Sequence, residues 1–429
     1  MTRVLHVTPH LGGGVGKALA CLAEAHAAHG PDVAHEIACL DAPEKLDFVE
    51  RVRALGVPVA IAPSRAELGR LVERADVVQL EFWNHPSTMA TLCAGPLPAM
   101  RLVVWCHVNG LHFPRIPPGL LERAERFLFT SACSLAAPEV DALAGEAARR
   151  RAVVSSGAGV EDLPVPERSV RARPVRYGYI GSQNLAKLHP DYVDMLARVP
   201  LPDLRVRMLG DDTERPRLER QCAGAGRPGL LEFGGYTRDV AGELARLDVL
   251  VYLLNPFHYG TAENALIEAM AMGVVPVVMD NGAEALIVEH GRTGLVVSDA
   301  RGLADALLAL ERDAALRARL SAAAAGHARS TWTRARLAAA FGEQYALALR
   351  GPRTVVDFAA ALGTGPAQWF RAFVRDPAVY GASGAVALPA GAARHAHLER
   401  TKGSAAHFHD RFPGDPALAS WAGALAARR

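Results

Sequence analysis

Carboxylate and amide side chains gather in this sequence between residues 255 and 273. Glu263 and Glu268 stand there beside the polar turn Gly260–Thr261. Such a turn presents backbone N–H groups and the positive end of a helix dipole, which together bind anions, phosphates above all. A carboxylate inside the following helix, such as that of Glu268, can accept hydrogen bonds from two ribose hydroxyls. The residue types favour a nucleotide site, and the alternative is an ordinary strand–helix–strand unit in which Glu268 is solvated.

The elements that must position this turn follow from the hydrophobic pattern. Residues 247–254 are apolar on both faces, as in a central strand of a parallel sheet, and residues 274–280 form a second apolar run. Between the two runs we predict a helix that has Thr261 as its cap and ends at Gly273. This order places the turn at the carboxyl edge of a parallel sheet, where ligands of such sheets bind.

The rest of the chain repeats the alternation of strands and helices. We predict a strand over residues 3–8, a glycine-containing loop over 9–17 and an alanine-rich helix over 18–29. Strands at helix-sized intervals predict an α/β fold with doubly wound parallel sheets. The further predicted strands cover residues 57–62, 76–80, 101–106, 126–130, 152–155, 175–180, 205–209 and 230–233.

The glycine-containing loop matches neither of two known phosphate-binding motifs. Leu11 stands where a P-loop needs its first glycine, and Ala18 stands where it needs a Mg²⁺-binding hydroxyl. Lys17 occupies the place of the third glycine of a dinucleotide fingerprint. A P-loop and a dinucleotide fingerprint are therefore both excluded here.

Two predicted strand ends carry aromatic, amide and imidazole groups. Glu81, Asn84 and His85 follow one strand, and His107 follows another. Flat rings can cover the C–H face of a sugar while polar groups bind its hydroxyls, so these residues predict a sugar or polyol site. A purely structural role is the alternative for His107.

Composition and charge narrow the class of protein. The chain has 429 residues, of which 50% are hydrophobic, enough for two domains and an appendage. A net charge of +2 predicts no nucleic-acid partner. Six scattered cysteines, no leader and no apolar run near eighteen residues predict a reduced, cytoplasmic protein without a transmembrane segment. Histidines are common metal ligands, and four lie near the C-terminus: His395, His397, His407 and His409. No cysteine lies close to them in the sequence, so we predict no metal site.

The order of these motifs resembles the nucleotide-sugar site of the family-4-like retaining glycosyltransferases, the glycogen synthase and mannosyltransferase type. The resemblance covers roughly residues 1–345 and rests on Gly260-Thr261, Glu263-Asn264, the run 268–278 and Gly282, Gly291 and Gly294. It implies the GT-B fold, two Rossmann-like domains facing a cleft, with the donor held mainly by the second. It also implies a metal-independent, retaining hexosyltransferase that uses a nucleoside-diphosphate sugar as co-substrate and has no permanently bound cofactor. The acceptor, whether glycan, small molecule or polypeptide, and the oligomeric state stay unassigned.

The resemblance further implies roles for individual residues. Glu268 would bind the ribose, and His107, Lys187 and Glu263 are the catalytic candidates, with His107 near the transferred sugar and Lys187 on the diphosphate. Glu81, Asn84 and His85 are assigned to the acceptor side. The remaining donor candidates meet the diphosphate, the sugar or the base: Gly13, Gly14, Gly16, Gly260, Thr261, Ala262, Asn264, Tyr236 and Arg238.

The domain organisation follows from the same motifs. We predict an acceptor-side domain over residues 1–165, a donor domain over 166–345 and an extension over 346–429 that crosses back to the first domain, with a proline- and charge-rich linker at 161–174. Gly260 and Ser182 replace a glutamate and an arginine of the family pattern. These departures leave open a non-catalytic sugar- or nucleotide-binding or scaffolding protein. A second alternative is a sugar-nucleotide epimerase or hydrolase of the same fold, which would need acidic residues in the first domain, where Glu81 is the obvious one.

Overall fold

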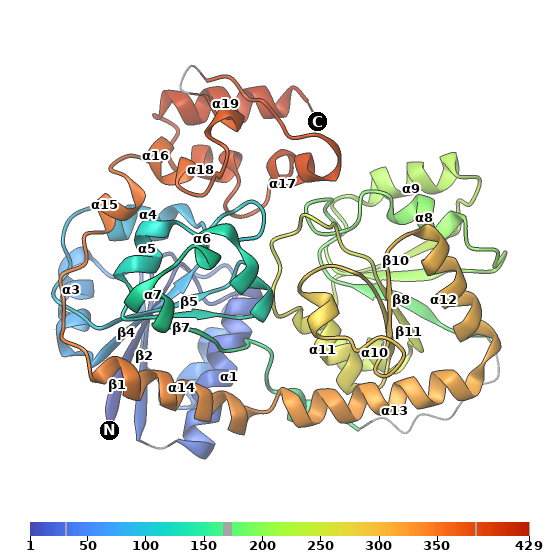
Figure 1. Cartoon of the computed structure of the whole chain (residues 1–429), viewed down its shortest axis with the longest axis horizontal. Coiled ribbons are helices and arrows are strands. Elements are labelled where there is room, and N and C mark those ends of the chain that lie inside the picture. Colours follow the sequence, from blue (N-terminus) through green and yellow to red (C-terminus); the bar gives the residue numbers. More distant parts are fainter. Residues whose placement is uncertain (31, 166–173, 382–383, 429) are drawn as a thin grey trace. The chain divides into compact units, whose positions relative to one another are not determined.

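The chain forms two compact units in the computed structural model, which describes residues 1–30, 32–165, 174–381 and 384–428 (Figure 1). The first unit comprises Met1–Ala158, Tyr259–Thr261 and Arg334–Arg429, and the second comprises Gly159–His258 and Ala262–Thr333. Most of the predicted linker, residues 166–173, lies outside the described residues.

A seven-stranded parallel sheet forms the centre of the first unit, in the order β3-β2-β1-β4-β5-β6-β7. The strand order reverses between β1 and β4, which is the doubly wound arrangement of a Rossmann-like domain. Our sequence prediction missed β2, because His35 and Glu36 interrupt its apolar pattern. The strands are β1 (Thr2–Thr8), β2 (Val33–Cys39), β3 (Val59–Ile61), β4 (Val77–Phe82), β5 (Leu102–Cys106), β6 (Arg126–Phe129) and β7 (Arg151–Val153).

Helices cover both faces of this sheet. Val4, Val77 and Val103 belong to a core shared with α1 and α14, whereas Leu5 and Val78 belong to a second core, on the other face. The helical segments of the N-terminal part are α1 (Gly13–His29), α2 (Asp47–Ala54), α3 (Arg65–Arg74), α4 (Pro86–Cys93), α5 (Pro118–Arg123), η1 (Ala132–Ala136), α6 (Pro138–Asp141) and α7 (Gly145–Arg149).

Helix α1 begins five residues earlier than the sequence predicts, so the expected loop over residues 9–17 is wrong in its second half. Gly12 is the extended N-cap, and residues 13–17 form the first turn and more of the helix. Gly16 allows this because a Cβ there would lie 2.8 Å from the Phe48 ring and 2.9 Å from the Leu11 backbone. The predicted phosphate glycines therefore lie at a helix N-terminus.

A six-stranded parallel sheet forms the centre of the second unit, in the order β10-β9-β8-β11-β12-β13. This order is again doubly wound, and α11 packs against the long helix α13. The strands are β8 (Tyr177–Ile180), β9 (Val206–Leu209), β10 (Leu231–Gly235), β11 (Val249–Tyr252), β12 (Val275–Met279) and β13 (Leu295–Val297). The helical segments are η2 (Val160–Asp162), α8 (Tyr192–Ala197), α9 (Arg215–Gly224), α10 (Val240–Ala245), α11 (Asn264–Ala271), η3 (Glu284–Leu286), α12 (Ala300–Arg312) and α13 (Ala314–Thr331).

The predicted cap of α11 is wrong, and its predicted end is right. Glu263, not Thr261, is the N-cap, and it adopts the left-handed conformation with φ 40°. The helix ends at Ala271, and Gly273 follows with φ +67°, a conformation that favours glycine.

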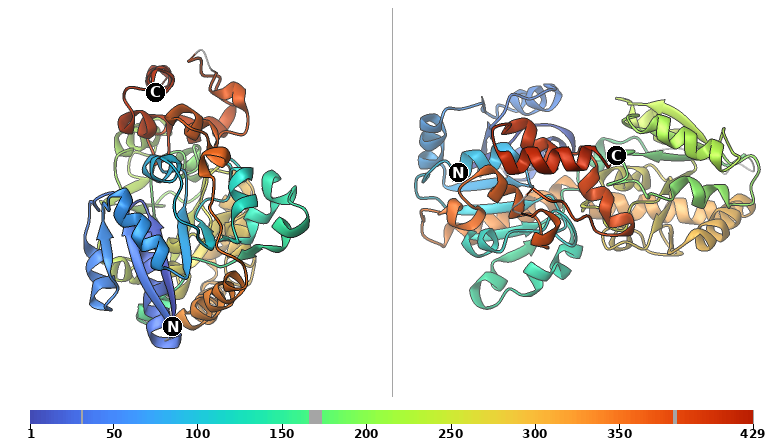
Figure 2. Two further views of the ribbon diagram at one scale, coloured as in Figure 1. Left: turned by 90° about the vertical axis from the view of Figure 1, so that its left-hand side faces the viewer. Right: turned by 90° about the horizontal axis from the view of Figure 1, so that it is seen from above.

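The C-terminal segment packs against the N-terminal part of the first unit. Thr354 pairs with Met100 in an antiparallel bridge, and Arg353 donates hydrogen bonds to the backbone oxygens of Glu73 and Ala75. Helices α15, α16 and α18 pack against α4, and Figures 1 and 2 show these orange and red helices on the light-blue helix α4. The C-terminal helices are α14 (Arg334–Leu349), α15 (Phe358–Leu362), α16 (Pro366–Arg371), η4 (Pro377–Val379), η5 (Gly391–Arg394), α17 (His395–Leu398), α18 (Ala405–Arg411) and α19 (Pro416–Ala426).

No helix within the described ranges combines the length and the apolar content needed to cross a bilayer. All six cysteines are free thiols, and Cys93 alone is not fully buried.

Candidate functional site

The carboxyl edge of the first sheet brings Glu81 and His107 into direct contact. Glu81 lies near the end of β4 with 0% of its side chain exposed, and its Oε2 is 2.9 Å from Nε2 of His107, just after β5. Its Oε1 accepts a hydrogen bond from Gln79 Nε2 at 2.8 Å and lies 3.1 Å from His6 Nδ1. Glu81 therefore reaches a substrate only through His107.

Three histidines extend this contact away from the sheet edge: the buried His6 and His26 and the partly buried His35. His6 Nε2 lies 2.8 Å from His35 Nδ1, and His35 Nε2 lies 2.8 Å from His26 Nδ1. Strand register explains the alignment, because His6 pairs with Gln79 in the neighbouring strand. Their side chains then share one face of the sheet, the face covered by α1 and α14.

Burial and hydrogen bonding decide the charges in this group. Burial raises the pKa of Glu81, but hydrogen bonds from His107 and His6 outweigh it and hold that pKa below its ordinary value. Burial lowers the pKa of His26 to about 4 and that of His35 well below its ordinary value. At neutral pH the group thus contains an ionised carboxylate and, at its outer end, two neutral imidazoles.

Asn84 and His85 begin the loop after β4 together with Trp83. The Trp83 ring lies 5.8 Å from the His85 ring and 6.2 Å from the His107 ring, measured between centroids. Burial lowers the pKa of His85 to about 2, so this imidazole is neutral. The loop thus offers rings and neutral polar groups beside His107, as a sugar site requires.

The C-terminal segment also contributes to this loop, which sequence reasoning missed. The His407 ring lies 4.9 Å from the His85 ring, and Asn84 donates a hydrogen bond of 2.8 Å to the Gly403 carbonyl. Lys402 Nζ lies 3.1 Å from Nε2 of His10. Residues more than 300 positions away meet here, so no local sequence signal could have found them.

The glycines predicted to meet the donor lie at the same edge of the first sheet. Gly13 and Gly14 are exposed in the first turn of α1, the helix that follows β1, and Gly16 is buried two residues further on. The first N–H groups of a helix lack intrahelical acceptors, so this 17-residue helix presents free donors at its start.

The second unit holds Lys187 and Glu263 together at the edge of its sheet. Lys187 Nζ lies 2.8 and 2.7 Å from the two carboxylate oxygens of Glu263, and Tyr252 at the end of β11 donates to Glu263 Oε2 at 2.6 Å. The exposed fractions of the two charged side chains are 14% and 2%. Burial raises the pKa of Glu263, and the charges of Lys187 and His258 outweigh it, so the pKa is lowered and the pair is ionised.

His258 links this ion pair to a further buried carboxylate, that of Glu284. His258 lies 3.9 Å from Glu263 through Nδ1 and 3.1 Å from Glu284 through Nε2. Asn281 donates to Glu284 and to the Leu254 carbonyl, both at 3.2 Å. The residues after β11 are therefore held rigidly beside the start of α11.

The remaining donor candidates take different places. Glu268 lies half-buried within α11, one turn after Asn264, whereas Tyr236 and Arg238 are exposed after the edge strand β10. Ala262 belongs to the second unit, but Gly260 and Thr261 belong to the first. Within the first unit, the Gly260 carbonyl accepts a hydrogen bond from the Asn109 side chain, and the Thr261 hydroxyl accepts one from the Thr130 hydroxyl.

Three side chains of the second unit have buried polar atoms that lack a hydrogen-bond partner among the described residues. Gln183 lacks one at both Oε1 and Nε2, and Asn184 and Asn264 lack one at Oδ1. Buried polar atoms are rarely left unpaired unless a ligand or water completes them. Gln183 and Asn184 were missed as site residues although they precede Lys187 in the same turn. No cluster of three or more metal-binding side chains occurs in the described part of the chain.

Two doubly wound parallel-sheet domains and ligand groups at the strand ends define a Rossmann-like α/β protein of the GT-B type, so the predicted fold class is confirmed. The solved structure of Anabaena HepE in complex with UDP and glucose superimposes with a TM-score of 0.64 at 16% identity, covering 81% of this chain and all of HepE.

Sequence comparison narrows the class further. The family described as "Glycosyl transferases group 1" matches residues 176–313. A lipopolysaccharide core biosynthesis glycosyltransferase of Rhizobium meliloti, LpsE, is 31% identical over 131 residues, which are 30% of this chain and 37% of LpsE. An exopolysaccharide phosphotransferase of Streptomyces coelicolor is 27% identical over 289 residues, 65% of this chain and 27% of that protein. The chain thus matches only about a third of the length of these curated relatives.

Proposed function

We propose that this protein is a glycosyltransferase that transfers a sugar from a nucleoside diphosphate to a saccharide acceptor. The observation that carries the proposal is that the candidate donor-site residues lie within the segment that matches a glycosyltransferase family. The segment that matches the glycosyltransferase family, residues 176–313, contains Lys187, Glu263 and Glu268 and also the unpaired polar atoms of Gln183 and Asn264.

The second unit binds the donor in this proposal. The half-buried Glu268 accepts the ribose hydroxyls, and the N–H groups at the start of α11 hold the diphosphate. Tyr236 and Arg238 contact the base. UDP is the first nucleotide to test, because the structurally similar HepE has been solved with UDP, with UDP and glucose and with UDP-glucose.

Lys187 stabilises the departing diphosphate, and Glu263 holds Lys187 in place. A buried carboxylate that binds both oxygens to one ammonium fixes the position of that ammonium. A fixed cation stabilises the charge that develops on the leaving group without the cost of reorganisation. We further propose that transfer occurs with retention and without a metal, as in the family-4-like enzymes that the sequence resembles.

The first unit binds the acceptor in this proposal. The Trp83 ring stacks on a sugar, Asn84 and His85 bind its hydroxyls, and His107 lies at the transferred sugar. The glycine turn of α1 adds N–H groups for the diphosphate. The names of the two curated relatives, one for lipopolysaccharide core and one for exopolysaccharide, support a glycan as the acceptor. We propose a cytoplasmic location, which the six free thiols support.

The test is a donor panel of UDP- and GDP-sugars with an oligosaccharide acceptor mixture, with and without EDTA, followed by mass spectrometry of the products. We expect a new glycoside that survives EDTA and retains the donor's anomeric configuration. Glu268→Ala should abolish transfer and weaken UDP binding in calorimetry. Loss of transfer in EDTA would contradict metal independence.

The same experiment separates the two alternatives. Saturable UDP binding without turnover of any donor would indicate a binding or scaffolding protein, which the replacements at Gly260 and Ser182 favour. Conversion of one sugar nucleotide into another, or its hydrolysis without an acceptor, would indicate an epimerase or a hydrolase.

A further inference from the structure

The hydrogen-bonded group behind His107 is larger than a catalytic histidine needs. It runs from His107 through Glu81 to His6, His35 and His26, with separations of 2.9, 3.1, 2.8 and 2.8 Å. These residues come from α1 and from strands β1, β2 and β4, and from the turn after β5. Within the first unit they form one continuous chain of polar contacts between the sheet and α1.

Hydrogen-bond chemistry fixes the proton positions next to Glu81. An ionised carboxylate only accepts hydrogen bonds, so both histidines that contact it must donate. His107 therefore carries a hydrogen on Nε2, and Nδ1 holds the lone pair whenever the ring is neutral. His6 carries a hydrogen on Nδ1, and its Nε2 is held by His35.

We propose that Glu81 is a positioning residue for His107, and that His6, His35 and His26 lock Glu81 in place so that Nδ1 of His107 receives a hydrogen bond from a substrate hydroxyl. This inference rests on the proposed glycosyl transfer, because that reaction identifies the hydroxyl as one of a sugar. The hydrogen-bonded arrangement of His107, Glu81 and the three further histidines is independent of the proposed function.

Burial explains why so many partners are needed. A carboxylate with no exposed surface is costly unless several donors satisfy it, and Glu81 has Gln79, His6 and His107. The Tyr345 hydroxyl on α14 donates to Gln79 at 2.6 Å, which turns the amide NH₂ of Gln79 toward Glu81. Without the His35 contact, the His6 ring would be free to turn its bare nitrogen toward Glu81.

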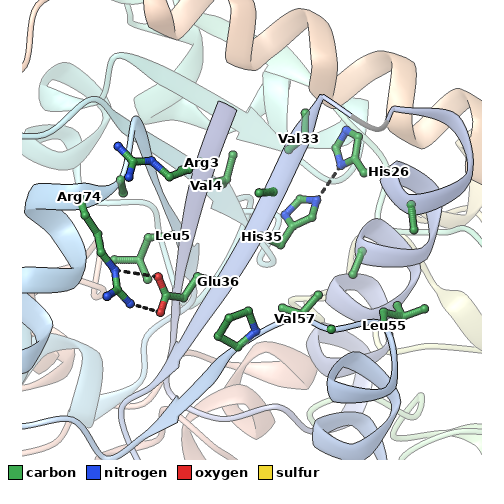
Figure 3. A pocket seen from close by; sticks show the side chains of 16 residues that line it. Arg3, Val4, Leu5, His26, Val33, His35, Glu36, Leu55, Val57 and Arg74 are labelled. Carbon is green, nitrogen blue, oxygen red and sulfur yellow. Dashed lines mark hydrogen bonds and ion pairs between the residues drawn. The ribbon is translucent and has the colours of Figure 1, made fainter. Parts of the chain in front are cut away.

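The outer end of the chain opens on a cavity of about 490 Å³. Figure 3 shows His26 and His35 in its lining, joined by their hydrogen bond, with the Arg74–Glu36 ion pair on another side. Arg3 is the further charged residue of this lining. Solvent protons thus have access to the end of the chain that lies farthest from His107.

The first test needs no variant and no activity. In protein labelled with ¹⁵N-histidine, two-bond ¹H–¹⁵N spectra at neutral pH should show His107 with its hydrogen on Nε2 and His6 with a hydrogen on Nδ1. The assignment comes from the loss of one signal set in each single histidine variant. A His107 that carries its hydrogen on Nδ1 would overturn the proposal.

The second test uses a matched pair at His35. In His35→Asn the amide replaces Nδ1 and retains the contact to His6, whereas in His35→Gln it replaces Nε2 and retains only the contact to His26. His35→Asn should leave the His107 spectrum as in the wild type. His35→Gln should change it and should raise the acid limb of the kcat–pH profile by about one unit, because Glu81 loses a donor and gains protons more readily.

His397→Asn is the control, because it removes a buried histidine of the same unit that bonds to Tyr380 instead. Its His107 spectrum and kcat–pH profile should match the wild type. Identical His107 spectra and pH profiles for the two His35 variants would overturn the proposal. If no donor is turned over, the proposed function fails, and the spectra of the same proteins still decide the role of the histidine chain.

Discussion

At the scale of single residues, Lys187 has two requirements that usually conflict: a free charge for a diphosphate and a salt bridge to the buried Glu263. A diphosphate needs a free positive charge, yet this lysine already contacts a buried carboxylate with both oxygens. A buried pair is costly to break by removing one partner, because the other charge is left uncompensated. The pair therefore serves to fix one ammonium group rather than to add net positive charge.

Lys187→Met should lower the free energy of unfolding by about 3 kcal/mol, because Glu263 would remain buried without its cation. Glu263→Gln should have a cost of similar size. The double variant should be more stable than the sum of the two losses predicts, since neither charge then remains. Urea unfolding measures all four proteins, and single variants as stable as the wild type would contradict a structural role for the pair.

His397 provides a pH test of burial. Its pKa is lowered to about 4 by burial, below the ordinary 6.5, so the unfolded chain binds this proton first as the pH falls. The contribution of His397 to stability is therefore present above pH 6.5 and is lost as the pH falls toward 4. Between pH 6.5 and 4.5 the wild type should lose about 2 kcal/mol more than His397→Asn. Parallel urea-unfolding curves for the two proteins would show that His397 is not kept neutral by burial.

At the scale of elements, two helix glycines have opposite surroundings. Gly16 in α1 faces the Phe48 ring and the Leu11 backbone, whereas a Cβ at Gly326 in α13 would meet nothing within 4 Å. Gly16→Ala should destabilise the protein by about 1–3 kcal/mol, because the Leu11 backbone cannot move aside easily. Gly326→Ala should stabilise it by about 0.5–1 kcal/mol through helix propensity. Thermal unfolding of both variants gives the comparison, and a stable Gly16→Ala would contradict the close packing.

Much of the fold could be predicted because local patterns and tertiary structure agree. Apolar runs mark β1, β4, β5, β11 and β12, and Gly273 marks the end of α11. The prediction failed where a tertiary contact decides the conformation. Gly16, which packs closely on Phe48 and Leu11, lies within α1 rather than in the predicted loop, and the left-handed backbone of Glu263 moves the cap of α11 away from Thr261.

The candidate site was predictable only in part, for the same reason. Strand ends pointed to Glu81 and His107, and their contact follows from parallel strands that share an edge. The His6–His35–His26 chain was missed because single histidines in apolar segments resemble ordinary core residues. Lys402 and His407 were missed because only the folded tail brings them to the loop of His85.

At the scale of the whole molecule, the two units have separate cores, but the first is not built from contiguous sequence. Phe370, Tyr380 and Trp421 are buried in the same core as Leu80 and Phe82. The C-terminal segment therefore completes the first unit and is not an appendage to the second.

Phe370→Ala should lower the stability of the first unit by about 4 kcal/mol, because it leaves a cavity beneath α16. The second unit should be unaffected, so calorimetry should show one transition moved down and one unchanged. UDP identifies the second transition in the proposed function, since a ligand at 100 times its Kd adds about 2.7 kcal/mol to the unit that binds it. A single transition that moves as a whole in the variant would contradict independent cores.

The packing of α15, α16 and α18 against α4 has a consequence for biosynthesis. As the ribosome extends the polypeptide, residues 1–158 emerge first, yet the surface of α4 that these three C-terminal helices cover stays exposed until they have been translated. The second unit is complete about a hundred residues earlier and can fold while synthesis continues. Chaperones that shield nascent hydrophobic surface should therefore be engaged by the oldest part of the chain for longest, and should release it only after translation ends.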